Sequence, residues 1–262
     1  MQADLHILTV DEYQCSFVSG NSKKRPNIAA LEAALKISKT LENCLLNERV
    51  RVCIGVSSGK THVGNLGNHQ LRVHSIVGPL ISNAKKLSAL CQIINGCSIL
   101  ADANTLSMGD AKQAFVVRPV ERLVVENDAF HGIVSSVYHV IKENNVEKDE
   151  WMYELEQQKA NGRFKDFESA FSIFEQSSIT DDVALEKIHE SQKILQNHLE
   201  KYPEDTFTTN RILKVLETIC DRSKREGRVS HALSSYRTVV KKSFEGVTNM
   251  SNLVEIDSAS FE

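Results

Sequence analysis

The chain has 262 residues, of which 41% are hydrophobic and 25% are charged, enough to bury the core of one medium domain with a smaller appendage. Its formal net charge of −3 excludes a whole-chain field that would attract nucleic acid or anionic lipid, so no nucleic-acid partner is expected. No segment has the length and apolarity of a membrane span, and the first residues lack the pattern of a secretion signal. We therefore expect a cytoplasmic chain, or the cytoplasmic side of a larger membrane protein if the chain is a fragment.

The cysteines give no sign of a metal site or of a disulfide framework. Six are scattered without a C-x-x-C pair, most of them inside apolar runs: Cys15, Cys44, Cys53, Cys91, Cys97 and Cys220. A thiol in such a run behaves as a small hydrophobic side chain. Because zinc sites and disulfide frameworks need paired spacings, we expect these cysteines to be reduced.

The first part of the chain, residues 1–142, alternates short β-branched runs with amphipathic stretches. The runs that predict strands are Leu5–Thr9, Tyr13–Val18, Val50–Val56, Val73–Val77, Ile93–Leu100, Phe115–Val125 and Ile133–Ile141. The stretches with helical spacing are Pro26–Leu46, Pro79–Cys91 and Asp102–Met108. This order predicts an α+β domain, with a mixed or antiparallel sheet flanked by helices and a hairpin at its end.

The second part, residues 150–240, lacks strand signals. Helical periodicity covers Trp151–Glu175, Asp181–Lys201 and Thr206–Arg225, and Pro203 separates the last two because proline cannot continue a helix. The apolar spacing resembles tetratricopeptide (TPR) helix pairs, although no regular repeat period can be laid over it. We expect an all-helical tail that resembles TPR helix pairs, and no regular structure in residues 241–262, where polar residues dominate.

A glycine-rich pattern runs through the middle of the first part. Gly59, Gly64 and Gly67 permit sharp turns and close approach of neighbouring chains. Their spacing does not fit the phosphate loop G-x-x-x-x-G-K-[ST], and no G-x-G-x-x-G opens a helix. These two common nucleotide-binding fingerprints are therefore excluded.

Five separate pieces of sequence share the order and spacing of one family. The family shows a strand ending I-G-x-x-x-G, a V-x-G-x-x-G turn, a strand ending I-G before a helix with N-x-x-x-R, then R-P-x-x-x-V-x-x-K-G and V-Y-x-V. The counterparts here are Ile54–Gly59, Val63–Gly67, Ile76–Gly78 with the helix through Lys86, Arg118–Val125 and Val137–Val140. On these residues, roughly residues 5–141 resemble the class III adenylate/guanylate cyclase catalytic domain.

The resemblance implies a site built by two domains that meet head to tail. In the family, one domain supplies two aspartates that hold two metal ions, and the other supplies a purine-reading lysine and aspartate with a transition-state asparagine and arginine. The strand with the first metal aspartate would precede Met1. Asp11 matches the second metal aspartate, although a role in a hairpin turn is the favoured interpretation.

The other four positions do not hold the side chains of the family. The purine-reading lysine falls on Ile7 and its acidic partner on Ser75, while the asparagine falls on Ser82 and the arginine on Lys86. Lys86 keeps the charge but lacks the planar, two-pronged donor set of arginine, and a place on a solvated helix face is the favoured interpretation. Asn83 adjoins Ser82, but one residue along a helix turns a side chain by about 100°.

The chain keeps the glycines of the family pattern but has lost most of the side chains that bind metal, read the purine and stabilise the transition state. This combination predicts a non-catalytic cyclase-homology module, regulatory or interacting, in intracellular signalling. We expect no cofactor, a homo- or heterodimer through the cyclase-type interface, and a protein partner on the helical tail. The alternative is a subunit or fragment of an active adenylate or guanylate cyclase, which would need Mg²⁺ or Mn²⁺ and a complementing partner. A third interpretation is the C-terminal piece of a longer protein whose upstream residues hold the opening strand.

Overall fold

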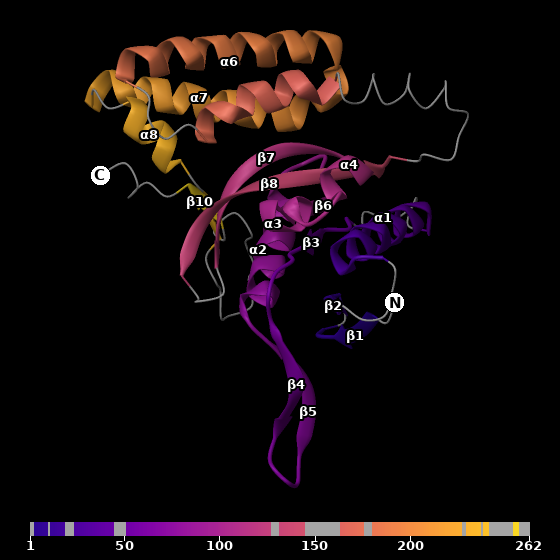
Figure 1. Cartoon of the computed structure of the whole chain (residues 1–262). Coiled ribbons are helices and arrows are strands. Elements are labelled where there is room, and N and C mark those ends of the chain that lie inside the picture. Colours follow the sequence, from indigo (N-terminus) through magenta and orange to yellow (C-terminus); the bar gives the residue numbers. More distant parts are fainter. Residues whose placement is uncertain are drawn as a thin grey trace.

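A central six-stranded sheet with helices on both faces organises the chain (Figure 1). The computed structural model describes residues 3–9, 11–18, 24–44, 51–126, 131–144, 163–175, 180–226, 229–236, 238–240 and 254–256. Helices α1 (Pro26–Cys44) and α2 (Pro79–Ile93) lie on one side of the sheet, and the helices of the tail lie on the other (Figure 1). The prediction of an α+β fold with a mixed sheet flanked by helices is confirmed.

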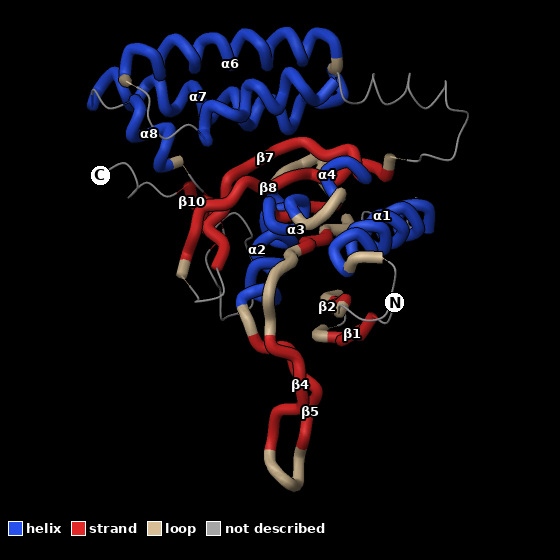
Figure 2. Tube along the Cα trace, viewed as in Figure 1, coloured by secondary structure: helices blue, strands red, loops and turns tan. Residues whose placement is uncertain are grey.

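Two long strands form the middle of the sheet. β7 (Phe115–Glu126) and β8 (Gly132–Glu143) pair as the predicted antiparallel hairpin, with register shifts that accommodate Pro119. β6 (Ile99–Asp102) pairs antiparallel with β8, and β3 (Ile54–Val56) pairs parallel with β6. The sheet is therefore mixed. Figure 2 shows its strands in red beneath the tail.

The edge of the sheet opposite β3 is formed by two strands from the end of the chain. β9 (Thr238–Val240) pairs parallel with β7, and β10 (Val254–Ile256) pairs antiparallel with β9. The range 150–240, expected to be helical throughout, thus ends in a strand. In 241–262, expected to lack regular structure, the described residues form β10, and the remainder lies outside the described residues.

Two predicted strands begin later than the sequence indicates. The predicted strand Ile93–Leu100 is wrong in its first half, because Leu90 and Cys91 continue the buried face of α2 and the helix ends only at Ile93. Gly96, at φ 80°, then turns the chain into β6. Of the predicted strand Val50–Val56, the described part is extended from Ile54 onward as β3, and residue 50 lies outside the described residues.

The core between the sheet and its first helix layer consists of two clusters. α1 contributes Leu31 and Ala34 to a cluster completed by β-strand residues and by the short helices α3 (Ala103–Ser107) and α4 (Ala111–Ala114). α2 contributes Leu87 and Leu90, which pack on side chains of β7 and β8. Because each fully buried leucine stabilises a fold by about 1.5–3 kcal/mol, these clusters fix both helices on the sheet.

Two further hairpins lie outside the six-stranded sheet. β1 (Ala3–Ile7) pairs with β2 (Tyr13–Phe17), and β4 (His62–Gly67) pairs with β5 (Arg72–Val77). The β4–β5 hairpin projects away from the sheet (Figure 1). Residues 63–67, expected to form a turn, are part of β4, and the turn follows at Gly67, whose φ of 138° suits glycine.

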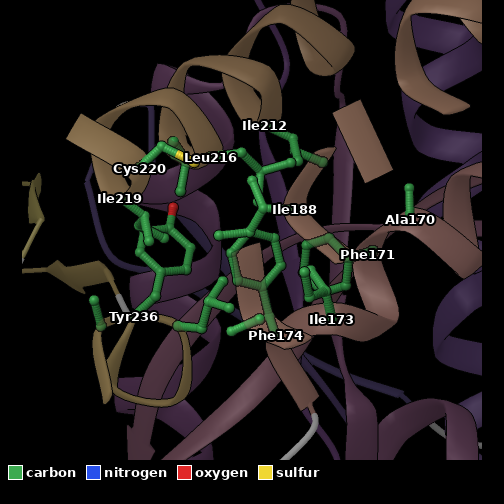
Figure 3. Close-up of a cluster of buried hydrophobic side chains, with 14 of the residues drawn as sticks. Ala170, Phe171, Ile173, Phe174, Ile188, Ile212, Leu216, Ile219, Cys220 and Tyr236 are labelled. Carbon is green, nitrogen blue, oxygen red and sulfur yellow. The ribbon is translucent and has the colours of Figure 1, made fainter. Parts of the chain in front are cut away.

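The tail is a helical unit with a core of its own. A helical segment, 163–171, leads through a 3₁₀ turn (Ser172–Glu175) to α6 (Asp181–Lys201), α7 (Thr206–Glu226) and α8 (Val229–Ser235). Phe167, Phe171 and Phe174 lie in this core, and Figure 3 shows Phe174 packed among side chains from α6 and α7. Residues 151–162 of the expected first helix lie outside the described residues, and the relation to TPR pairs stays a prediction.

Charged side chains join the tail to the sheet. Arg118 of β7 is buried and donates to Asp205 at 2.7 Å, and the same carboxylate accepts hydrogen bonds from Arg163 and contacts Nε2 of His198. Three residues farther along β7, buried Glu121 accepts hydrogen bonds from Arg211 of α7, and from Tyr236, which follows α8. β7 thus presents apolar side chains to α2 and two buried charges to the tail.

No helix in the described ranges combines the length and the apolarity needed to cross a membrane.

Candidate functional site

Two of the predicted site residues, Ser82 and Lys86, lie on α2. Its start is fixed locally, because Gly78 adopts φ 155°, which favours glycine, and Pro79 fits the first turn of a helix. Leu87 and Leu90 face the core. Ser82 and Lys86 are four residues apart and therefore share one side of the helix, which lies beside the end of β7.

Glu126, the last residue of β7, holds both of these side chains. Its Oε1 lies 3.0 Å from the ammonium of Lys86 and 3.3 Å from the hydroxyl of Ser82. The Lys86 and Glu126 side chains are only 13% and 20% exposed, so water screens the pair less than it screens a surface ion pair. Lys86 also reaches the carbonyl of Val124. The cation at the family's arginine position is therefore neutralised from within the chain.

Asn83 fastens α2 to the same strand end. Its amide nitrogen donates to the backbone carbonyl of Glu126 at 2.8 Å, and its amide oxygen accepts from the backbone N–H of Glu126 at 2.8 Å. Asn83 is buried and thus cannot replace Ser82 at the family's asparagine position. It acts instead as a backbone clamp, which saves a buried polar side chain from remaining unpaired.

Asp11 lies in the turn between β1 and β2. Its Oδ1 accepts a hydrogen bond from the hydroxyl of Thr9 at 2.7 Å, a short-range pattern typical of aspartate in turns. The neighbouring Glu12 forms an ion pair with Lys85 of α2 at 3.1 Å. The turn that carries Asp11 is therefore held against the helix that carries Lys86.

The two positions that correspond to purine-reading residues lie on different hairpins. Ile7 ends β1, pairs with Tyr13 of β2 and has a 70% exposed side chain. Ser75 lies on β5, opposite Gly64 of β4. An exposed isoleucine cannot donate a hydrogen bond to a base, and a serine hydroxyl cannot supply the charge of the family's carboxylate.

The described residues do not fit the two metal ions that the family resemblance implies. Within the described ranges, no group of three or more histidine, cysteine, aspartate or glutamate side chains is arranged to hold a metal ion. Asp11 offers one carboxylate, which already accepts a hydrogen bond from Thr9. Hard divalent cations need several oxygen ligands, so no step of a reaction can be routed through a metal bound to these residues alone.

Arg118, from the R-P piece that resembles the family, lies at the junction between β7 and the tail, where it contacts Asp205. It does not belong to the group formed by Ser82, Lys86 and Glu126. Burial raises the pKa of its partner Asp205, but hydrogen bonds from His198 and Arg163 and the charge of Arg118 outweigh burial and hold that pKa well below its usual range. Burial, aided by the charge of Arg118, lowers the pKa of His139 on β8 to about 3. The junction therefore contains a charged aspartate and a neutral histidine at neutral pH.

The segment Ile54–Gly59 supports a helix start. Ser57 donates to the buried carboxylate of Asp102 at 2.5 Å, and the same carboxylate accepts from the backbone N–H and hydroxyl of Thr105. Asp102 is the N-cap of α3, and burial raises its pKa. This carboxylate serves the fold, since its oxygens are occupied by neighbours in the chain.

No sequence pattern indicates a role for Glu126, Asp205 or Arg51. Glu126 follows an apolar strand, and only its pairing with a helix about forty positions away reveals its role. Asp205 follows Pro203 in a 3₁₀ turn, where an acidic residue is common for local reasons. Arg51 precedes a strand, yet its guanidinium donates to the backbone carbonyls of Cys91, Ile94 and other residues at the end of α2.

Comparisons with known proteins give weak structural similarity alone. No family model matches the chain, and no curated protein matches it in sequence. Among solved structures, a bacterial light-regulated adenylyl cyclase matches with a TM-score of 0.41 and 18% identity over 60% of this chain. The match spans 44% of that cyclase chain, less than half its length. A similarity of this size assigns no family.

Proposed function

We propose that this chain is a cyclase-homology module that does not make a cyclic nucleotide by itself and that acts through binding, as a regulatory or interaction unit in signalling. The motif resemblance over residues 5–141 supports the cyclase-homology part. The observation that carries the non-catalytic part is the pair between Lys86 and Glu126 at 3.0 Å.

The pair matters because a cyclase uses the cation at this position to stabilise charge on its substrate. Charge develops on the phosphorus during cyclisation, and a preorganised cation must meet it. The ammonium of Lys86 already faces a carboxylate in a partly buried site, so a triphosphate would have to displace Glu126. The cost of breaking that pair, together with the repulsion between Glu126 and phosphate, opposes nucleotide binding.

The proposed binding surface is the projecting β4–β5 hairpin, and the proposed partner is a second copy of this chain. Leu66 and Leu71 near its tip are 52% and 69% exposed, and Val63 and Val77 are also exposed. Exposed apolar side chains on a projecting hairpin are typical of association surfaces. Two copies related by a twofold axis could cover both hairpins at once.

The first test is isothermal titration of the purified chain with ATP and with GTP, each with Mn²⁺. We expect no metal-dependent binding to the wild-type chain. Glu126→Gln, which frees Lys86, should raise the affinity for triphosphate by about fivefold, equivalent to about 1 kcal/mol. Glu12→Gln is the matched control, because it removes the exposed partner of neighbouring Lys85 and should change nothing. Tight manganese-dependent binding to the wild-type chain would overturn the proposal.

A second candidate function is a subunit of an active adenylate or guanylate cyclase. The observation that favours it is the Lys85–Glu12 ion pair, which holds the turn with Asp11 against α2. A partner chain would have to supply the other metal-binding aspartate and the purine-reading side chains. Cyclic-nucleotide production by this chain together with a cyclase partner, and its loss in Asp11→Asn, would establish this function over the first.

A further inference from the structure

Three of the six cysteines gather where the end of α2 meets the start of β3. Cys91 and Cys97 are buried in the same cluster, and Cys53 is partly buried and packs against it. Arg51 precedes Cys53 by two residues. Its guanidinium donates to the backbone carbonyls of Cys91 at 2.8 Å and Cys97 at 3.1 Å. The cluster thus combines three thiols with one cation.

The backbones of β3 and α2 approach closely at this point. Ser88 of α2 donates to the carbonyl of Cys53 at 3.0 Å. A Cβ atom on Gly55 would lie 2.1 Å from the carbonyl oxygen of Ala84, so only glycine permits this contact. Cys91 follows Ser88 by three residues and therefore lies one turn along the same helix face, beside Cys53. Cys53 packs against the cluster that contains Cys91, and the two side chains interact.

Cys97 is directed elsewhere, although it belongs to the same cluster. Its thiol interacts with the side chains of Arg118 and Thr208 at the tail junction. Its backbone carbonyl, and not its sulfur, accepts a hydrogen bond from the thiol of Cys91 at 3.1 Å. Cys91, and not Cys97, is therefore the thiol that interacts with the Cys53 side chain.

From this arrangement we infer that Cys53 and Cys91 are a peroxide-reactive thiol pair, which closes an intramolecular disulfide between the start of β3 and the last turn of α2. Disulfides require Cα atoms about 4.4–6.8 Å apart, and the hydrogen bond from Ser88 of α2 to the Cys53 carbonyl brings the two backbones close together at this point. This modification site lies in the last turn of α2. It is distinct from the contacts of Ser82 and Lys86 with Glu126, which lie nearer the start of the helix.

The two cysteines have different roles. Cys53 is the attacking thiol, because it is partly exposed, whereas Cys91 is fully buried and out of reach of solvent. Hydrogen bonding with the Cys91 side chain outweighs burial and, with the charge of Arg51, lowers the pKa of Cys53 to about 7. The same interaction, together with burial, raises the pKa of Cys91 far above its usual range. A substantial fraction of Cys53 is thiolate at neutral pH, and thiolate is the nucleophile.

The chemistry balances with hydrogen peroxide as the oxidant. The Cys53 thiolate attacks one peroxide oxygen, the O–O bond breaks, and hydroxide leaves as Cys53 becomes a sulfenic acid. The Cys91 thiol then attacks the sulfenic sulfur and gives up its proton to the leaving hydroxide, so that an S–S bond forms as the S–O bond breaks. Two protons released by the thiols convert the leaving hydroxides to water. In sum, two thiols are oxidised to one disulfide and one peroxide is reduced to two waters.

The experiment uses the full chain with the exposed thiols Cys15 and Cys44 replaced by serine, which prevents cross-linking between molecules. The protein is treated with hydrogen peroxide, its remaining thiols are blocked with N-ethylmaleimide, and it is digested with trypsin. We expect peptide Val52–Lys60 joined to peptide Leu87–Lys112, with fragment ions that place the bond at Cys91, and reversal by dithiothreitol. The oxidation rate should rise about tenfold from pH 6 to pH 8 and then level off.

Two serine variants separate the pair from its neighbour. Cys91→Ser should abolish the linked peptide and leave a Cys53 sulfenic acid that dimedone traps. Cys97→Ser, at an equally buried position in the same cluster, should leave the link intact. The inference is overturned if Cys53 stays labelled by N-ethylmaleimide in the unsubstituted pair, or if fragment ions place the bond at Cys97.

Discussion

The projecting β4–β5 hairpin and the helical tail differ in how far their apolar side chains are buried. In the tail, three phenylalanines and side chains from α6, α7 and α8 cover one another almost completely. In the hairpin, Leu66 and Leu71 remain more than half exposed. The contrast indicates that the tail fills its own core, whereas the hairpin leaves apolar surface for another molecule to cover.

The two regions also differ in how they are joined to the sheet. The tail is joined through buried charges, since Asp205 meets Arg118, and Arg211 meets Glu121. A buried ion pair contributes little over apolar packing, but removal of one partner is costly because the other charge is left buried. The tail is thus sensitive to single substitutions at the junction, and the hairpin should tolerate substitutions at its tip.

The largest expected effect is that of Asp205→Ala. It leaves Arg118, Arg163 and His198 without their common acceptor in a buried site, and should lower the free energy of unfolding by about 3–5 kcal/mol. Urea denaturation measures the change. Glu204→Ala is the control, because this neighbouring carboxylate is exposed and its ion pair with Arg163 should contribute at most about 1 kcal/mol. Equal losses from the two variants would remove the distinction between the buried and exposed pairs.

A smaller effect is expected from pH, through His139 beneath the tail. Its folded-state pKa of about 3 lies below the unfolded value of about 6.5, so the unfolded chain binds a proton that the folded chain does not. Stability is therefore present above pH 6.5 and is lost as the pH falls toward 3, by about 2–3 kcal/mol between pH 7 and pH 4.5.

Thermal or urea unfolding of His139→Gln across this range tests the assignment. The variant should lose the histidine-dependent part of the slope. His189→Gln, which alters an exposed histidine of α6, should keep the wild-type slope. An unchanged slope in His139→Gln would show that another group causes the acid sensitivity.

The smallest change in stability, and the largest in association, is expected from the double variant Leu66→Ser and Leu71→Ser. Both side chains are exposed, so the free energy of unfolding of the monomer should change by no more than about 0.5 kcal/mol. Light scattering should show a lower mass than for the wild-type chain at equal concentration. Phe207→Ser removes an exposed apolar side chain from α7 and should leave the mass unchanged. A wild-type chain that is monomeric at all concentrations contradicts the proposed pairing.

Much of the fold could be predicted because its signals are local. α6 begins and ends at the predicted residues, since its apolar period is clear and proline follows its end. The β7–β8 hairpin was likewise evident from two β-branched runs and a polar gap. The end of α2 was misplaced because Ile93 and Ile94 have a high strand propensity, and packing on the sheet overrides that preference.

The candidate site could be predicted only in part. Family-like spacing located Ser82 and Lys86, which the structure places together, but it could not reveal that Glu126 holds both. That contact joins α2 to the end of β7 and depends on how the helix lies on the sheet. The sequence does not indicate the strands β9 and β10 for a related reason: each is a three-residue segment that gains regular structure only by pairing, β9 with β7 and β10 with β9.

The position of β9 has a consequence for how the chain is synthesised. β7 leaves the ribosome long before Thr238, and the intervening residues include the whole helical tail. At about 5–20 residues per second, the edge of β7 waits on the order of ten seconds for its partner strand. During that interval an apolar strand with free backbone groups is open to pairing with other nascent chains.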